Sequence, residues 1–373
     1  MRFLIVLFAL LPVLAWDEPV GDKKVILLED TEVYQPLQVW EVEVSPKGHV
    51  YAINFQESYI NHYGPDGTKL ANIGSRGKGP GEFGYIVDLF FLNGKLYALD
   101  MLDGQMSIFS EDGKFEKRMK LPERGLKLAR MSNGWLYGDW ASWFGDHNGK
   151  LYMVGEDFTQ PKTLVEMKEK TMNRGTYSMS NDGEVKAFHN PITTHPYLVG
   201  SPDGKKAYLT DSWALKIHIF DEKGNKRTID RKEKRIPFDM EWAQEGLREA
   251  NERGKKEGTV YKLQAPEYFP VIRSIKVGPE GNLIIDRWRG RPDDNHHPIA
   301  LNDKGEEVPM KYDWDVVDRM FGVANGHIYL SIFNHETEQG GVARVKLEDA
   351  NAWAKANPLD YEGDIGHSID ISN

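Results

Sequence analysis

Short apolar segments separated by glycine-closed turns recur along almost the whole chain. Segments such as Val50–Ile53 and Lys95–Leu99 alternate or run apolar, and they are rich in β-branched and aromatic residues. Such segments are typical of β-strands. Glycine closes the turns because these positions often need a positive φ, which other residues resist. The pattern predicts a protein built almost entirely of short strands.

The turns form two alternating series. Turns of the first series lie at residues 45–48, 92–94, 131–134, 201–204, 278–281 and 324–326. Turns of the second series follow them at residues 64–67, 110–113, 180–183, 221–224, 302–305 and 338–341. Each repeat contains one turn of each series and therefore four strands. Six such repeats predict an all-β, six-bladed β-propeller of four-stranded antiparallel blades. Residues 23–29 precede the first repeat, and we expect them to supply the outer strand of the last blade.

Two regions depart from the repeat. The third unit is long and contains an extra strand-like segment, Leu151–Val154. It is either one blade with a long excursion between its second and third strands or the remains of a seventh blade, and we favour six blades. Residues 233–269 form an insertion between blades four and five. Its middle, Asp239–Lys256, is charged and carries Ala and Leu at helical spacing, which predicts a small helix in a lid-like segment.

The two ends of the chain differ from the propeller region at 23–349. The first 15 residues combine a basic start, a short apolar run and small residues before Ala15, the pattern of a signal peptide cleaved near Ala15. We therefore expect an exported protein, either periplasmic or extracellular. Residues 350–373 form a C-terminal tail that begins with a helical turn over 350–356.

The amino-acid composition argues against several classes of covalent link, metal site and binding partner. The absence of cysteine excludes disulfides and thiolate metal sites, and the net charge of −10 argues against nucleic acid and anionic membranes. No later segment is apolar enough to insert into a membrane. We expect a monomer.

The antiparallel order of the strands divides the connections between two faces. The turns of both series lie on one face, here called the turn face, and all other connections lie on the opposite one, the long-loop face. Every long connection falls on the long-loop face. Long loops on a rigid scaffold are where binding usually occurs.

Aromatic and charged residues collect in these long connections. Together they suit a protein, peptide or glycan ligand, because aromatic rings and guanidinium groups contact sugars, peptides and carboxylates. The candidate ligand-binding residues are Arg76, Trp140, Trp143, His195, Asp211, Trp213, Arg287, Trp288, Arg289, His296, His297 and His335. For each residue alone, packing between blades is the competing interpretation.

The sequence contains no motif that is specific for an active site. No spacing resembles a helix-borne zinc motif, and no serine lies in a nucleophile elbow. Aspartates close the second strand of several blades, at Asp100, Asp139, Asp211 and Asp286, with Asn54 in the first blade. A position repeated in this way predicts a structural role, such as accepting loop amide hydrogens.

One segment resembles a known repeat. Residues 73–83 (IGSRGKGPGEF) resemble the opening of the NHL repeat, and the match continues through Leu96–Asp100 to Gly113. Residues 211–224 resemble the second half of the same repeat. Because a strand and not a helix follows residues 74–83, we expect their glycines and Pro80 to let the chain cross from the outer edge of one blade to the axis of the next, with Phe83 between blades. The chain also resembles the broader group of exported bacterial six-bladed propellers.

The resemblance implies two kinds of function. NHL-like propellers commonly bind proteins or other ligands through one face, and we favour such a non-enzymatic binding module without a cofactor. Some relatives are metal-dependent hydrolases or lyases, including lactonase-like enzymes with calcium in the central channel. Their metal ligands have no residue-by-residue counterparts in this sequence, so no metal site or catalytic residue is assigned.

Overall fold

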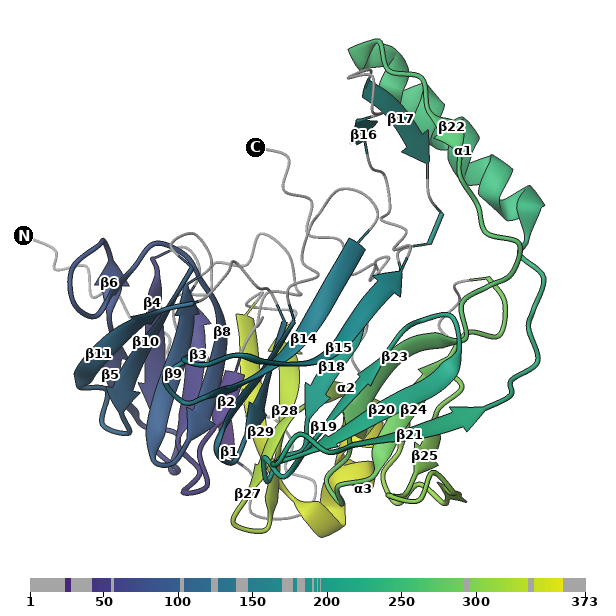
Figure 1. Ribbon diagram of the computed structural model, residues 1–373. Coiled ribbons are helices and arrows are strands. Elements are labelled where there is room, and N and C mark those ends of the chain that lie inside the picture. Colours follow the sequence, from purple (N-terminus) through teal and green to yellow (C-terminus); the bar gives the residue numbers. More distant parts are fainter. Residues whose placement is uncertain are drawn as a thin grey trace, which may run out of the picture.

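The computed structural model describes residues 24–27, 42–54, 57–100, 104–121, 127–138, 147–169, 177–179, 185–189, 191–192, 194, 196–291, 296–334 and 339–357. Six four-stranded antiparallel sheets stand in a ring (Figure 1). The prediction of a six-bladed propeller is confirmed, and the seven-bladed alternative is wrong.

Each blade runs from an inner strand at the axis to an outer strand at the rim. Blade one contains β2 (Val42–Val44), β3 (Val50–Asn54), β4 (Tyr59–Tyr63) and β5 (Lys69–Ile73). Blade two contains β8 (Ile86–Leu92), β9 (Lys95–Asp100), β10 (Gln105–Ser110) and β11 (Phe115–Lys120). Blade three contains β12 (Lys127–Met131), β13 (Gly134–Gly138), β14 (His147–Gly155) and β15 (Lys162–Glu169). Blade four contains β18 (Tyr197–Gly200), β19 (Lys206–Thr210), β20 (Leu215–Asp221) and β21 (Lys226–Arg231). Blade five contains β23 (Ile272–Val277), β24 (Leu283–Arg287), β25 (Ile299–Leu301) and β26 (Glu307–Val308). Blade six contains β27 (Met320–Ala324), β28 (His327–Asn334), β29 (Gln339–Lys346) and β1 (Lys24–Leu27).

The two ends of the chain close the ring in one blade. Strand β1 pairs antiparallel with β29, from Lys24 opposite Arg344 to Leu27 opposite Gly341. The predicted contribution of residues 23–29 to the last blade is confirmed.

Two of the predicted turns are wrong. The turn at 180–183 does not close blade three, because the third strand of that blade is β14, which includes Leu151–Val154, and the fourth is β15. The extra residues of this unit therefore follow the outer strand instead of separating the second and third strands. In blade six, Gly340 and Gly341 are not in a turn, because they pair with Phe333 and Ile332 inside the β28–β29 ladder.

Apolar side chains fill the seams between blades. Phe83 is fully buried in the cluster that joins blades one and two, as predicted. It lies in the short crossover pair β6 (Ser75–Arg76) and β7 (Glu82–Phe83). Gly74 has a φ of +78°, and a Cβ at this position would come within 2.2 Å of the Phe83 ring. The glycine-rich crossover is thus needed to seat this phenylalanine.

Near the axis, an ion pair links the inner strands of several blades. Glu43 of β2 accepts hydrogen bonds from Phe91 N at 2.9 Å and from Arg130 Nη1 at 3.0 Å. Arg130 Nη2 also donates to Pro202 O of blade four at 2.7 Å. Burial raises the pKa of Glu43, although Arg130 opposes this shift. Four blades are held together by these two side chains.

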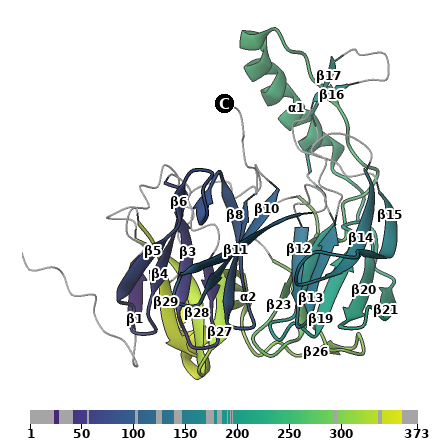
Figure 2. The ribbon, with the colours of Figure 1, turned by 60° about the vertical axis from the view of Figure 1, so that its left-hand side comes forward.

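The long-loop face carries a projecting unit, here called the arm, built from the connections that follow blades three and four. The arm consists of β16 (Tyr177–Met179), β17 (Val185–His189), α1 (Met240–Gly254), the 3₁₀ turn η1 (Lys255–Glu257) and β22 (Lys262–Leu263). β17 and β22 pair in parallel, with Phe188 opposite Lys262. Figures 1 and 2 show the arm rising from one side of the ring.

Contacts within the arm join the helix to both connections. Asn251 of α1 accepts from Tyr261 N at 2.7 Å and donates to Tyr261 O at 3.2 Å. A Cβ at Gly246 would lie 2.8 Å from His189 Nε2, so the helix and β17 approach closely at this glycine. The predicted helix is confirmed, and it belongs to a unit that also includes the hairpin first attributed to blade three.

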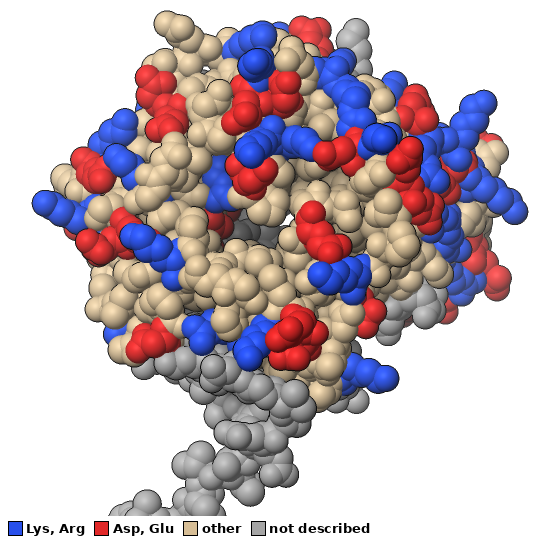
Figure 3. Space-filling model, turned by 90° about the horizontal axis from the view of Figure 1, so that it is seen from below, with Lys and Arg blue, Asp and Glu red and all other residues tan. Residues whose placement is uncertain are grey.

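The opposite face carries the tight turns. Basic and acidic side chains are interspersed on it around a central opening (Figure 3). Helix α2 (Trp314–Arg319) packs between blades five and six. After the 3₁₀ turn η2 (Leu347–Asp349), α3 (Ala350–Ala356) packs against α2 at the turn-face end, so the predicted C-terminal helix is confirmed and this face is not made of tight turns alone.

Candidate functional site

The arm joins the ring through an aromatic cluster. Phe238 and Phe269 are buried, with ring centroids 4.5 Å apart, and Phe269 stacks on Trp288 of the ring at 6.3 Å. Below the arm, a short antiparallel stem is formed by Phe238 N donating to Glu267 O and Phe269 N donating to Ile236 O. Trp288, a predicted ligand contact, thus packs at the base of the arm.

Three arginines of blade five face carboxylates of the insertion. Glu233 lies between two of them, with Oε1 3.5 Å from Arg287 Nη1 and Oε2 3.5 Å from Arg289 Nη2. Asp239 caps the N-terminus of α1 by accepting from Trp242 N, and its Oδ2 accepts from Arg291 Nε at 2.6 Å.

Two pKa shifts reflect these contacts. The hydrogen bond from Arg291 holds the pKa of Asp239 below its usual value. Burial, aided by neighbouring Arg289, lowers the pKa of Arg287. The arginines therefore anchor the arm, and their use by a ligand stays a prediction.

A buried carboxylate orients a histidine beside this anchor. Asp286 is fully buried, and its Oδ2 lies 2.8 Å from His296 Nδ1 while its Oδ1 accepts from His297 N at 2.8 Å. Arg273 Nε is 3.7 Å from the same carboxylate. The His296 ring packs on Trp314 at 5.1 Å. If Asp286 accepts the Nδ1 proton, Nε2 of His296 is the proton-accepting nitrogen.

The other residues that close second strands accept hydrogen bonds from backbone amides of the loops. Asp100 accepts from Gly84 N at 2.6 Å, and Asp211 accepts from Trp213 N at 2.7 Å and Ala214 N at 3.0 Å. Asn54 accepts from Glu57 N at 3.0 Å. The predicted structural role is confirmed at these positions and at Asp286, whereas Asp139 lies outside the described residues.

The predicted site residues are only partly brought together. Arg287, Trp288, Arg289, His296 and His297 share the end of blade five, next to the arm. Trp213 is linked to this region because its carbonyl oxygen accepts from Arg235 Nη2 at 3.5 Å.

Other predicted residues are elsewhere. Arg76 lies in β6, which Figures 1 and 2 place across the ring from the arm. Trp140, Trp143, His195 and His335 lie outside the described residues.

Several residues of the region were not predicted. Glu233 and Asp239 belong to a segment of mixed charge, and nothing in their spacing indicates that blade five lies opposite. Arg273 is different, because it lies in the inner strand β23 and its guanidinium lies 5.4 Å from the centre of the Trp288 ring. A cation within an inner strand is a signal that could have been used.

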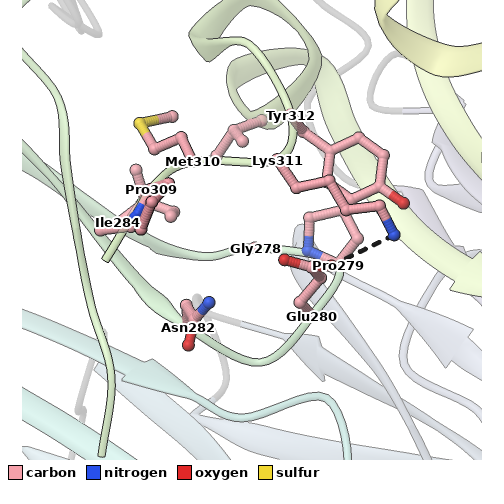
Figure 4. A pocket seen from close by; sticks show the side chains of 11 residues that line it. Gly278, Pro279, Glu280, Asn282, Ile284, Pro309, Met310, Lys311 and Tyr312 are labelled. Atoms are coloured by element: carbon pink, nitrogen blue, oxygen red, sulfur yellow. Dashed lines mark ion pairs between the residues drawn. The ribbon is translucent and has the colours of Figure 1, made fainter. Parts of the chain in front are cut away.

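A shallow pocket lies away from all of these residues. Its volume is about 250 Å³, including open solvent, and it is lined by the turn Gly278–Glu280 and by residues 309–312 (Figure 4). Lys311 Nζ reaches Glu280 Oε1 at 3.2 Å across it. None of the predicted site residues lines this pocket.

The part of the chain that the structure describes contains neither a metal-ligating group of side chains nor a helix that could span a membrane. Within it, no three or more His, Asp, Glu or Cys side chains are grouped so that they could hold a metal ion. No helix there is long and apolar enough to cross a membrane.

Comparisons with known proteins give structural matches only. No protein-family model and no curated protein sequence matches the chain. An exported-protein candidate from Bacteroides fragilis NCTC 9343 is 12% identical, with a TM-score of 0.46 over 87% of this chain and 94% of that chain. A virginiamycin B lyase from Staphylococcus aureus is 13% identical, with a TM-score of 0.39 over 87% and 99%. A DUF4221 family member from Bacteroides vulgatus is 11% identical, with a TM-score of 0.43 over 87% and 96%. The resemblance to NHL repeats stays a prediction.

Proposed function

We propose that this chain is an exported, NHL-like binding module that holds a protein, peptide or glycan ligand on its long-loop face, with the arm as one wall of the site. The observation that supports it is the arm itself. Two neighbouring connections, following blades three and four, assemble into one unit on a single face. The ring closes through β1 and β29, and the arm takes no part in that closure, which fits a role in recognition.

The chemistry around the base of the arm suits such ligands. Trp213 and Trp288 are both half-buried. Arg289 and Arg291 keep 30% and 49% of their side chains exposed despite their carboxylate partners. Indole faces pack on sugar rings or peptide planes, and guanidinium groups bind carboxylates and hydroxyls.

The half of the arm that follows blade four can be removed at its stem. Because Phe238 and Phe269 close the stem with backbone hydrogen bonds, residues 239–266, which contain α1, η1 and β22, can be replaced by a short Gly-Ser linker. This variant keeps β16 and β17 and is here called the arm-deleted variant. Panels of synthetic peptides and of oligosaccharides would be screened against the intact chain and against this arm-deleted variant. We expect at least one ligand whose affinity falls about tenfold or more in the variant.

Controls separate the two faces. The double variant Glu280→Ala, Lys311→Ala alters the turn-face pocket and should bind the same ligand as the parent. Circular dichroism checks that both variants remain folded. Equal affinity of the parent and a folded arm-deleted variant would contradict the proposal, and so would a failure of every probe to bind.

One observation favours a second function, that of a hydrolase or lyase. His296, oriented by buried Asp286, has the arrangement of a general base whose imidazolium form is stabilised by a carboxylate. In a lactonase-like reaction, Nε2 would take a proton from water as the water oxygen attacks the ring carbonyl. The ring C–O bond then breaks, and the imidazolium returns the proton to the leaving alkoxide oxygen. Turnover of a lactone or ester panel that is lost in His296→Ala and kept in His218→Ala would support this function. No turnover by the parent would exclude it for those substrates.

A further inference from the structure

The outer strand of blade four has an open edge. β21 is the last strand of its sheet and pairs only with β20 among the described strands. Figures 1 and 2 place it at the rim of the ring. Lys226, Arg227 and Thr228 are exposed, whereas Ile229 is only 7% exposed and anchors the strand in the core.

The hairpin turn determines which backbone groups face outward. Asp221 N donates to Asn225 O, and the register places Ile219 opposite Arg227 and Ile217 opposite Ile229. Hydrogen-bonded pairs recur every second residue in an antiparallel ladder. The N–H and C=O groups of Arg227, Ile229 and Arg231 therefore point to β20. Those of Lys226, Thr228 and Asp230 point away from the sheet.

The same edge is strongly basic, although the whole chain carries a net charge of −10. In residues 221–235, which comprise β21 and its flanks, the basic residues are Lys223, Lys226, Arg227, Arg231, Lys232, Lys234 and Arg235, and the acidic ones are Asp221, Glu222, Asp230 and Glu233. Lys226, Arg227 and Lys232 form no ion pair within the described part of the chain. The pKa of nearby His218 is lowered by burial and then by Lys226 and Lys216, as a local positive potential requires.

Among the other outer strands, β11 is also basic, with Lys117 and Lys120 exposed. Arg118 of β11 donates to Gly79 O at 2.9 Å, and Glu116 pairs with Lys95. β15 has both charge signs, with Lys162 and Glu166 exposed. β26 is only two residues long. Basic residues on an edge can simply prevent aggregation, but here they border a full six-residue strand. Arg231 pairs with Glu307 at 3.3 Å, whereas Lys226 and Arg227 have no carboxylate partner in the described part of the chain.

We propose that the β21 edge binds an acidic segment of a partner protein in an extended conformation, as an added strand. The outward N–H and C=O groups supply the main-chain bonds of β-augmentation, and the lysines and arginines select a peptide rich in Glu or Asp. A second copy of this chain would not pair through the same edge, because like charges would face each other. This site is separate from the long-loop face and does not depend on the function proposed for it.

Three labelled nonapeptides test the proposal by fluorescence anisotropy with the intact chain. The first alternates Glu and Val, the second replaces Glu by Lys, and the third keeps the Glu residues but carries proline at alternate positions. We expect the first to bind, the second not to bind and the third to bind about tenfold more weakly or worse. No binding of the first peptide, or equal binding of the proline peptide, would overturn the proposal. The latter result would indicate unspecific charge attraction, as for an anionic polysaccharide.

Variants of the protein locate the site. Lys226→Glu with Arg227→Glu should weaken binding of the first peptide about tenfold, and the matched variant Lys117→Glu with Lys120→Glu on β11 should not. Thr228→Pro removes one outward N–H and should weaken binding, whereas Thr228→Val keeps it and should bind as the parent does. The arm-deleted variant should also bind as the parent does. Equal losses in the β11 and β21 variants would overturn the assignment to β21.

Discussion

The seam between blades two and three and the base of the arm are both aromatic, but they are built differently. In the seam, Trp135 is fully buried, with its ring centroid 5.1 Å from Phe90, 5.1 Å from Tyr97 and 5.6 Å from Phe158. At the base of the arm, Trp288 is only half-buried and is supplemented by ion pairs at the surface.

This difference has a physical consequence. Surface ion pairs contribute about 0–1 kcal/mol each, whereas a fully buried aromatic side chain contributes several times more. The ring should therefore keep its stability when the arm is loosened, and the arm can be altered for recognition without loss of the scaffold.

The largest expected effect is in the seam. Trp135→Ala should lower the free energy of unfolding by about 3–5 kcal/mol, because it leaves a cavity among three other rings. Trp242→Ala in the arm should change the main unfolding transition by less than about 1 kcal/mol. Urea denaturation followed by fluorescence and circular dichroism measures both, and similar losses would mean that ring and arm fold as one unit.

A pH effect is expected where blades one and two meet. His62 is buried, stacks on Tyr51 at 4.6 Å and has Nε2 2.9 Å from His49 Nδ1. Burial and then His49 lower its pKa to about 4. The unfolded chain takes up this proton near pH 6.5 and the folded chain only near pH 4, so the contribution is complete above about pH 6.5 and is lost as the pH falls toward 4.

The size of this effect is about 3 kcal/mol, from the shift in the pKa of His62. His62→Phe keeps an aromatic ring against Tyr51 but cannot bind a proton. The difference in unfolding free energy between parent and variant should therefore change across this pH window and be constant above it. Parallel pH profiles for the two proteins would contradict the assignment.

Among the strand-closing aspartates, Asp286 should matter more than Asp211. Asp286→Ala should cost about 2 kcal/mol, because it leaves the His297 amide and part of Arg273 without their acceptor in a buried place. Asp211 is half-buried, and water can replace it, so Asp211→Ala should cost about 1 kcal/mol. Thermal unfolding of the two variants gives the order, and a larger loss for Asp211 would reverse this account.

The smallest effect is expected within the arm. Asp239→Ala removes the N-cap of α1 and the partner of Arg291, which should destabilise the helix locally by about 1 kcal/mol. Hydrogen exchange in Met240–Gly254 should quicken while exchange in β9 and β13 stays unchanged. Asp239→Asn is the matched control, since it keeps a capping oxygen. Faster exchange throughout the ring would show that arm and ring are not separable.

The ring could be predicted from the sequence because its signals are local. Turns of the first series are correct in all six blades, and the segment that precedes the first repeat supplies the outer strand of the last blade, as expected. The turn at 180–183 was assigned to the wrong unit because a hairpin gives the same signal in a blade and in an arm. The pairing of β17 with β22 joins two distant insertions, and no periodicity reports such a contact.

The candidate site was predicted less well for a related reason. The residues at the end of blade five are neighbours in sequence, so their proximity followed directly. Their partners Glu233 and Asp239 come from another connection and carry no distinguishing pattern. Arg76 shares the long-loop face with them, but a face shared by six blades does not make its residues neighbours.

Hydrogen exchange of the intact chain, with and without a ligand found in the peptide or oligosaccharide panel, tests the central claim most directly. The account predicts slower exchange in residues 236–269 and at the end of blade five, with no change in the turns at 45–48 and 278–281. Protection confined to those turns, with none in the arm, would contradict it.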